Sequence, residues 1–84
     1  MFSIYFKEDT PEQYKELILD YWRTENDQFI YMTEFLLGKH KLNYKRELYQ
    51  IIKSWCIVKF KNEILSTRSD FIKHKKSHQK NLFD

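Results

Sequence analysis

The sequence has few of the residues that mark loops and covalent cross-links, since its 84 residues include one Gly, one Pro and one Cys. A lone Cys excludes an intramolecular disulfide, so a disulfide-stapled secreted domain is excluded and a reducing, cytoplasmic setting is expected. Scarce Gly and Pro exclude flexible linkers and Gly-rich phosphate loops. No apolar run approaches the roughly 20 residues of a membrane-spanning helix, and no signal sequence is visible, so neither membrane insertion nor secretion is expected.

Aromatic residues, in contrast, are plentiful, with seven Phe, six Tyr and two Trp. A chain of this length has room for one hydrophobic core, and aromatic side chains bury a large area each. We therefore expect a single domain over residues 1–84, with a core over about residues 2–72 and a basic tail over residues 73–84. A homodimer is one way in which so short a chain could bury more apolar surface.

Charge is distributed unevenly along the chain. Through Gly38 there are three basic and eight acidic residues, a formal charge of −5, whereas from Lys39 onward twelve basic and four acidic residues give +8. This polarity favours an anionic partner at one end of the molecule, or association between unlike ends of two copies. A solvated surface on which charges happen to segregate is the alternative.

The first third of the chain predicts a strand followed by a helix. Residues 2–6 alternate between apolar and other side chains, as in a short strand with one buried face. Thr10 is a favoured N-cap, Pro11 suits the first helical position, and Gln13 completes a capping box. The apolar stripe that follows has helical spacing; its members are Tyr14, Leu17, Ile18, Tyr21 and Trp22.

A second helix is predicted between a cap at residues 24–26 and a stop at Gly38. Its apolar residues leave little polar surface, so it is expected to form the centre of the core. They are Phe29, Ile30, Tyr31, Met32, Phe35, Leu36 and Leu37.

A third helix, capped by Asn43, is indicated by another stripe, which consists of Tyr44, Leu48, Ile51, Ile52 and Trp55. Residues 56–60 and 64–67 are then favoured as a β-hairpin around a turn at residues 61–63, although a continuing helix fits the same run. A further helix should start near Ser69. The expected fold class is mainly α: a compact three-helix core with a short N-terminal strand and a C-terminal hairpin or extra helix.

Motifs for catalysis, cofactors and metals are lacking, so no enzyme, cofactor or metal site is expected. His74 and His78 have the spacing of two zinc ligands on a helix, but a closed zinc site needs four ligands. Cys56 lies in an apolar run, as a buried structural cysteine does. A basic tail near a few apolar residues is thin support for lipid binding.

The face of the third helix opposite its stripe is polar and has no acidic residue. Together with the predicted second helix and the connector between them, this helix resembles the helix-turn-helix DNA-binding motif over about residues 27–55. The predicted hairpin after it resembles the wing of the winged variant, with Lys59 and Lys61 on that wing. The resemblance implies that the helix enters the major groove of duplex DNA, where Arg and Gln pair with bases and Lys and Tyr hold phosphates. The implied contact residues are Lys41, Lys45, Arg46, Tyr49, Gln50 and Lys53.

The sequence thus predicts a small, non-catalytic nucleic-acid-binding protein, with duplex DNA favoured and the choice between DNA and RNA left open. The alternative is a protein-interaction module, such as an adaptor, subunit or inhibitor, that acts through its acidic first helix and surface aromatics. Leu19, on the polar side of that helix, would lie at the centre of such an interface.

Overall fold

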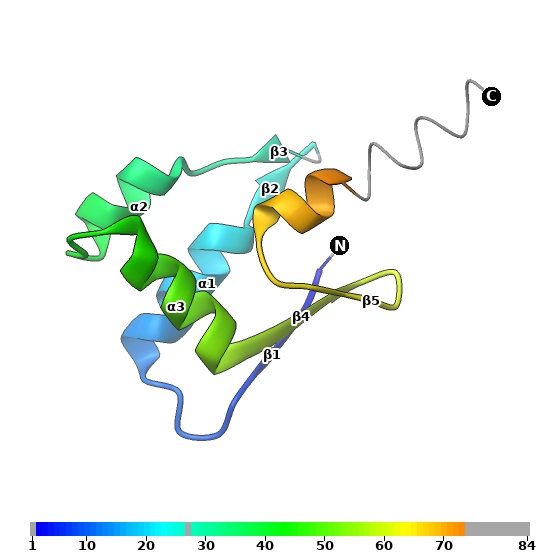
Figure 1. The fold of residues 1–84 in the computed structure, drawn as a ribbon, viewed down its shortest axis with the longest axis horizontal. Helices are drawn as coiled ribbons and strands as arrows, with labels where there is room; N and C mark the ends of the chain where they lie inside the picture. Colours follow the sequence, from blue (N-terminus) through cyan, green and yellow to red (C-terminus); the bar gives the residue numbers. More distant parts are fainter. Residues whose placement is uncertain (1, 27, 74–84) are drawn as a thin grey trace.

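A computed structural model describes residues 2–26 and 28–73 and shows a mixed α/β domain (Figure 1). Its elements in chain order are β1 (Ser3–Phe6), α1 (Glu12–Trp22), β2 (Thr24–Glu25), β3 (Gln28–Phe29), α2 (Thr33–Lys39), α3 (Lys45–Trp55), β4 (Cys56–Phe60) and β5 (Glu63–Leu65). Residues 68–73 are helical as well. The prediction of a mainly α fold is therefore wrong, because the N-terminal strand and the hairpin combine into one sheet.

The sheet has three antiparallel strands in the order β1-β4-β5. Residues 3–6 pair with residues 56–59, so the first strand of the chain lies against a strand that follows α3. The predicted hairpin is confirmed, and its turn is tighter than expected because Glu63 already pairs with Phe60. Lys61 and Asn62 form the turn with φ of 49° and 69°, the left-handed values that a two-residue hairpin turn needs.

α1 has the predicted buried stripe, in which Leu17, Ile18, Tyr21 and Trp22 are at most 2% exposed. Its start differs from the prediction, because Pro11 occupies the N-cap position and no side chain caps the helix. The hydroxyl of Thr10 donates instead to the carbonyl of Lys7 and, at 3.4 Å, to that of Trp55. A tertiary contact has therefore taken the place of the predicted capping box.

Residues 24–41 depart most from the prediction. A short hairpin, β2–β3, occupies the expected first turns of the second helix, and Asn26 adopts a φ of 54°. The helix α2 begins only at Thr33 and buries Leu36, while Ile30, Met32 and Phe35 are exposed. It is therefore not the centre of the core. Gly38 lies inside α2 and does not end it.

α3 confirms the third predicted helix. Leu48, Ile51 and Ile52 are buried as expected, whereas Tyr44 is 63% exposed and takes the N-cap position predicted for Asn43. The helix packs against α1 and α2 and continues directly into β4. This continuity fixes the direction of α3 relative to the sheet.

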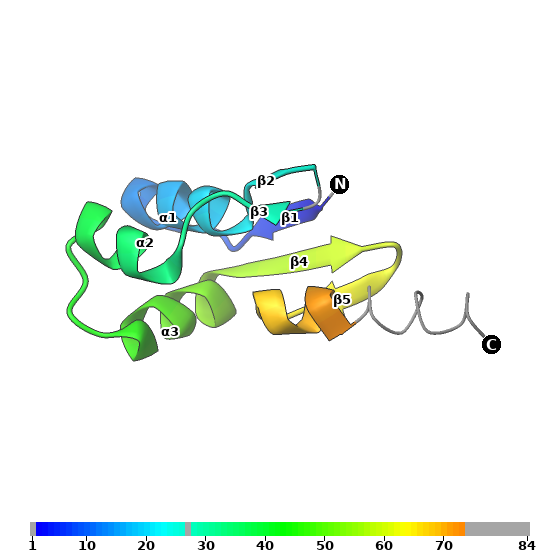
Figure 2. The same cartoon turned by 90° about the horizontal axis from the view of Figure 1, so that it is seen from above.

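An aromatic cluster joins the sheet, α1 and the C-terminal helical turn. Phe2 lies 5.0–6.0 Å, between ring centroids, from the rings of Trp22, Phe29, Phe60 and Phe71. Phe71 belongs to the helical residues 68–73, which confirm the predicted helix start near Ser69. Seen from above, the helical residues 68–73 and α3 lie on one side of β4, and α1 lies on the other side (Figure 2).

Among the described residues, no helix combines the length and the apolar character that crossing a membrane requires. Most of the basic tail predicted at residues 73–84, including the histidine pair His74 and His78, lies outside the described residues.

Candidate nucleic-acid interface

The exposed face of α3 carries the three polar side chains on which a binding surface can be built. Arg46, Gln50 and Lys53 are all exposed. They recur at positions i, i+4 and i+7, so they lie above one another on one side of the helix. The buried side of α3 fixes this orientation, because Leu48 and Ile52 are held in the core at 0% and 2% exposure. The face is therefore presented to solvent by packing.

Lys45, at the start of α3, is joined to the preceding helix. Its Nζ lies 2.9 Å from Oε1 of Glu34 on α2, and both side chains are more than half exposed. The hydrogen bond between them lowers the pKa of Glu34 and raises that of Lys45. Lys45 therefore adds less free positive charge to the surface than the sequence implies.

Tyr49 is half-buried and is held at the edge of the core. Its ring meets that of Tyr21 edge-on, with centroids 6.4 Å apart and an interplanar angle of 87°. Such edge-to-face contacts are favourable between aromatic rings. Tyr49 thus joins α3 to α1. The exposed face of α3 is formed by Arg46, Gln50 and Lys53 instead.

Lys41 is exposed in the turn between α2 and α3 and has a φ of 57°. This is the left-handed conformation that often follows the end of a helix, and the backbone N–H of Lys41 bonds back to the carbonyl of Gly38. The turn therefore sets Lys41 before the first turn of α3.

Residues from the C-terminal helical turn lie beside the far end of this face. The pKa of Asp70 is lowered mainly by hydrogen bonds to its carboxylate from the backbone N–H groups of Ser66 and Thr67, at 2.7 and 3.1 Å. The charges of Lys73 and Lys53 lower it further. The sequence carried a signal for this cap, because Thr67 precedes Asp70 by three residues, as in a capping box.

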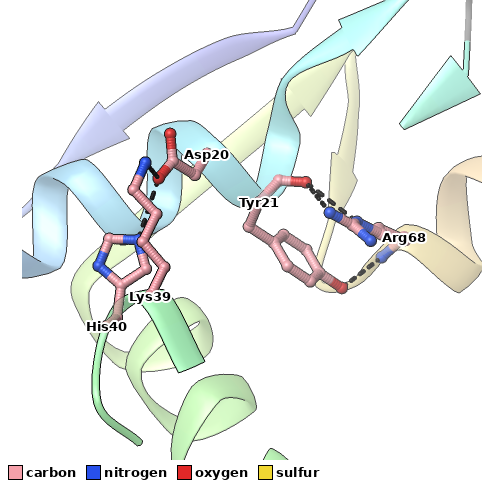
Figure 3. Close-up of polar contacts among 5 residues, drawn as sticks. All are labelled: Asp20, Tyr21, Lys39, His40 and Arg68. Atoms are coloured by element: carbon pink, nitrogen blue, oxygen red, sulfur yellow. Dashed lines mark hydrogen bonds and ion pairs between the residues drawn. The ribbon is translucent and has the colours of Figure 1, made fainter. Parts of the chain in front are cut away.

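Two groups of polar contacts hold the scaffold around α1 (Figure 3). The Oδ2 atom of Asp20 accepts hydrogen bonds from Lys39 Nζ at 2.8 Å and His40 Nε2 at 3.0 Å. On the other side, the guanidinium group of Arg68 donates to the carbonyl of Tyr21 at 2.8 and 3.0 Å, and its backbone N–H donates to the Tyr21 hydroxyl. Nothing in the local pattern around Arg68 predicted this role.

Cys56 is buried at the start of β4, and its Sγ lies 3.1 Å from the carbonyl oxygen of Ile52. Burial raises the pKa of this thiol to about 11. Over residues 2–26 and 28–73, no three side chains of His, Cys, Asp or Glu are grouped closely enough to hold a metal ion.

Comparisons with protein-family models, curated proteins and solved structures find no match to this chain.

Proposed function

We propose that this domain binds nucleic acid, with duplex DNA as the favoured form, through the exposed face of α3. The observation that carries the proposal is the stripe of Arg46, Gln50 and Lys53 at helical spacing, with no acidic residue between them on that face. Arg and Gln are the side chains that pair bidentately with guanine and adenine edges, and Lys neutralises phosphate.

The arrangement of elements supports a duplex as the ligand. The order α2, turn, α3 and hairpin is the order of a winged helix-turn-helix, although α2 is shorter than expected. A single helix with one exposed face matches the major groove, which is about 12 Å wide. Lys41 would contact a phosphate beside the start of α3, and Lys61 stands at the tip of the β4–β5 hairpin.

The structure ranks the six predicted contact residues for this proposal. Lys45 shares its charge with Glu34, and Tyr49 is half-buried against Tyr21. We therefore assign base and phosphate contacts first to the others, namely Lys41, Arg46, Gln50 and Lys53.

The test compares two double variants with the same change in net charge. Arg46→Glu/Lys53→Glu alters the proposed face, whereas Lys7→Glu/Arg23→Glu alters exposed residues elsewhere. We expect the first to weaken binding to a random duplex at least roughly tenfold and to reduce the slope of log K against log salt by about 1, since the phosphate contact of Lys53 is lost. The second should change binding much less.

Fluorescence polarisation measures the affinities of these proteins for duplex DNA, single-stranded DNA and duplex RNA. Measuring each at low and moderate salt also gives the salt dependence. Equal losses in the two double variants would show that net charge alone acts and would contradict the proposal. So would an absence of binding by the unchanged protein at low salt.

A second candidate function, binding to another protein through α1, is favoured by one observation. Leu19 is 51% exposed on the outer side of this helix, where Glu12 and Glu16 are exposed as well. Leu19→Glu should then disrupt complex formation and leave DNA binding intact, and the Arg46→Glu/Lys53→Glu variant should do the reverse.

A further inference from the structure

A groove runs between α1 and α3, beside the stripe described above, and Gln50 of that stripe stands at its edge. It consists of two adjoining hollows of about 430 and 330 Å³ that share Tyr14, Leu42 and Ile51 as lining residues. The first hollow extends toward the turn between α2 and α3, and the second extends along α3 to Trp55. Each hollow falls within or close to the size range of ligand sites in proteins.

The floor of the groove is apolar and its rim is polar. Leu17 and Ile51 close the floor at 1% and 9% exposure, and the rings of Tyr14 and Trp55 meet with centroids 5.8 Å apart. Gln13 on α1 and Ser54 on α3 are exposed rim residues. Polar and apolar side chains thus line the groove in similar number, which suits a ligand with one apolar and one polar side.

Opposite charges mark the two ends of the groove. The first hollow is lined by Lys39, His40 and Lys41. Lys39 and His40 share the carboxylate of Asp20, whereas Lys41 forms no ion pair with any residue in the described part of the chain. Glu47 lines the second hollow. A ligand that fits both ends therefore carries an acidic group near Lys41 and a neutral or basic group near Glu47.

We propose that this groove binds an amphipathic helix of a partner protein. Two adjoining hollows fit two apolar side chains one helical turn apart, because residues at i and i+4 lie about 6 Å from each other. The acidic group lies in the first turn of the bound helix, where the helix dipole also favours a negative charge. A nucleic acid fits less well, because the floor is apolar and Glu47 would repel phosphates.

Selection from a library of displayed helical peptides of about 16 residues, long enough for four turns, tests the proposal without knowledge of the partner. The randomised positions cover one face of each peptide. We expect enriched peptides to have two apolar residues three or four positions apart and an Asp or Glu one turn before them. Enrichment of peptides without that acidic residue, or no enrichment at all, would overturn the proposal.

Fluorescence polarisation of the most enriched peptide, labelled with fluorescein, locates the site. Lys41→Glu and Gln13→Glu should each weaken its binding about fivefold, because both place a carboxylate against the acidic end of the peptide. Gln28→Glu makes the same change at an exposed position in β3 and should have little effect. Equal affinities for all of these proteins would place the peptide elsewhere and contradict the proposal.

Two further measurements separate this site from the α3 face. Arg46→Glu/Lys53→Glu should leave peptide affinity within about twofold, since neither residue lines the groove. Trp22 is 2% exposed in the core and Trp55 lines the groove, so peptide binding should shift the emission of Trp55. An unshifted emission spectrum at saturating peptide would count against the groove.

Discussion

Neighbouring residues near the end of α1 hold this helix to two different parts of the chain by different chemistry (Figure 3). Asp20 is joined to Lys39 and His40, at the end of α2, by hydrogen bonds between side chains that carry or can carry charge. Tyr21 is joined to Arg68 through its backbone carbonyl and its hydroxyl. One contact group depends on a carboxylate that can be protonated, and the other depends on an arginine that donates to a backbone carbonyl.

The difference determines how each contact group responds to its surroundings. Partial burial raises the pKa of Asp20, but the hydrogen bonds from Lys39 and His40 outweigh this effect and leave it below its ordinary value. The Arg68 guanidinium lies 4.4 and 4.7 Å from the ring centroids of Tyr21 and Phe29. Burial lowers the pKa of Arg68, yet an arginine stays protonated in proteins. The C-terminal contact should therefore withstand acid and salt better than the α2 contact.

The largest effect is expected for Arg68→Ala, which removes two charged hydrogen bonds and two ring contacts. It leaves the Tyr21 carbonyl at the end of α1 without these donors, and we expect a loss of about 3 kcal/mol in the free energy of unfolding. Urea denaturation measures it. Arg68→Lys keeps the positive charge but lacks the planar guanidinium group. Its free energy of unfolding should therefore lie between those of the unchanged protein and Arg68→Ala. A loss in Arg68→Ala no larger than that in Asp20→Asn would reverse the comparison.

Tyr21→Phe tests the hydroxyl part of the same contact. The ring and its packing remain, but the backbone N–H of Arg68 loses its acceptor, 3.0 Å away. We expect a loss of about 1 kcal/mol, the usual value for one hydrogen bond. Thermal unfolding followed by circular dichroism measures the change, and an unchanged midpoint would show that the hydroxyl bond does not stabilise the fold.

Asp20→Asn should cost about 1 kcal/mol at neutral pH, and this cost should shrink in acid. Because the pKa of Asp20 in the folded protein lies below its ordinary value of 3.8, the unfolded chain takes up the proton first as the pH falls. The stabilisation is therefore complete above that ordinary value and is lost as the pH falls through the folded pKa. Unfolding free energies of both proteins across this range measure it, and a difference that is constant with pH would contradict the assignment.

Changing the salt concentration should have the smallest effect on the stability differences between these proteins. Raising the salt concentration from 0.1 to 1 M shortens the Debye length from about 10 to about 3 Å. The stability difference between the unchanged protein and Asp20→Asn should narrow, because Lys39 is 46% exposed. The difference for Arg68→Ala should stay nearly constant over the same range. Equal narrowing in both variants would mean that the two contact groups are screened alike.

Elements whose pattern agreed with their surroundings could be predicted from the sequence. The alternation in residues 3–6 and the stripes of α1 and α3 gave the right elements, because each buries one regular face. Residues 24–32 could not be predicted, since Phe29 fits a helical stripe but packs with Phe2 and Phe71, which lie far from it in sequence. A local pattern carries no information about such partners.

The candidate site was predictable to a similar degree. Helical spacing alone placed Arg46, Gln50 and Lys53 on one face of α3. It could not reveal that Lys45 pairs with Glu34 or that Tyr49 meets Tyr21, because both partners belong to other helices. The groove between α1 and α3 was likewise missed, since it arises only where two helices and a turn meet.

The pairing of β1 with β4 also has a consequence for how the chain folds. Residues 3–6 meet residues 56–59, so this pairing closes a loop that contains α1, α2 and α3. Forming such a distant contact costs loop-closure entropy before any strand bonds form, whereas the β4–β5 hairpin needs only a local turn. We therefore expect α3 and the hairpin to form the early nucleus, with the N-terminal strand added late as the slow step.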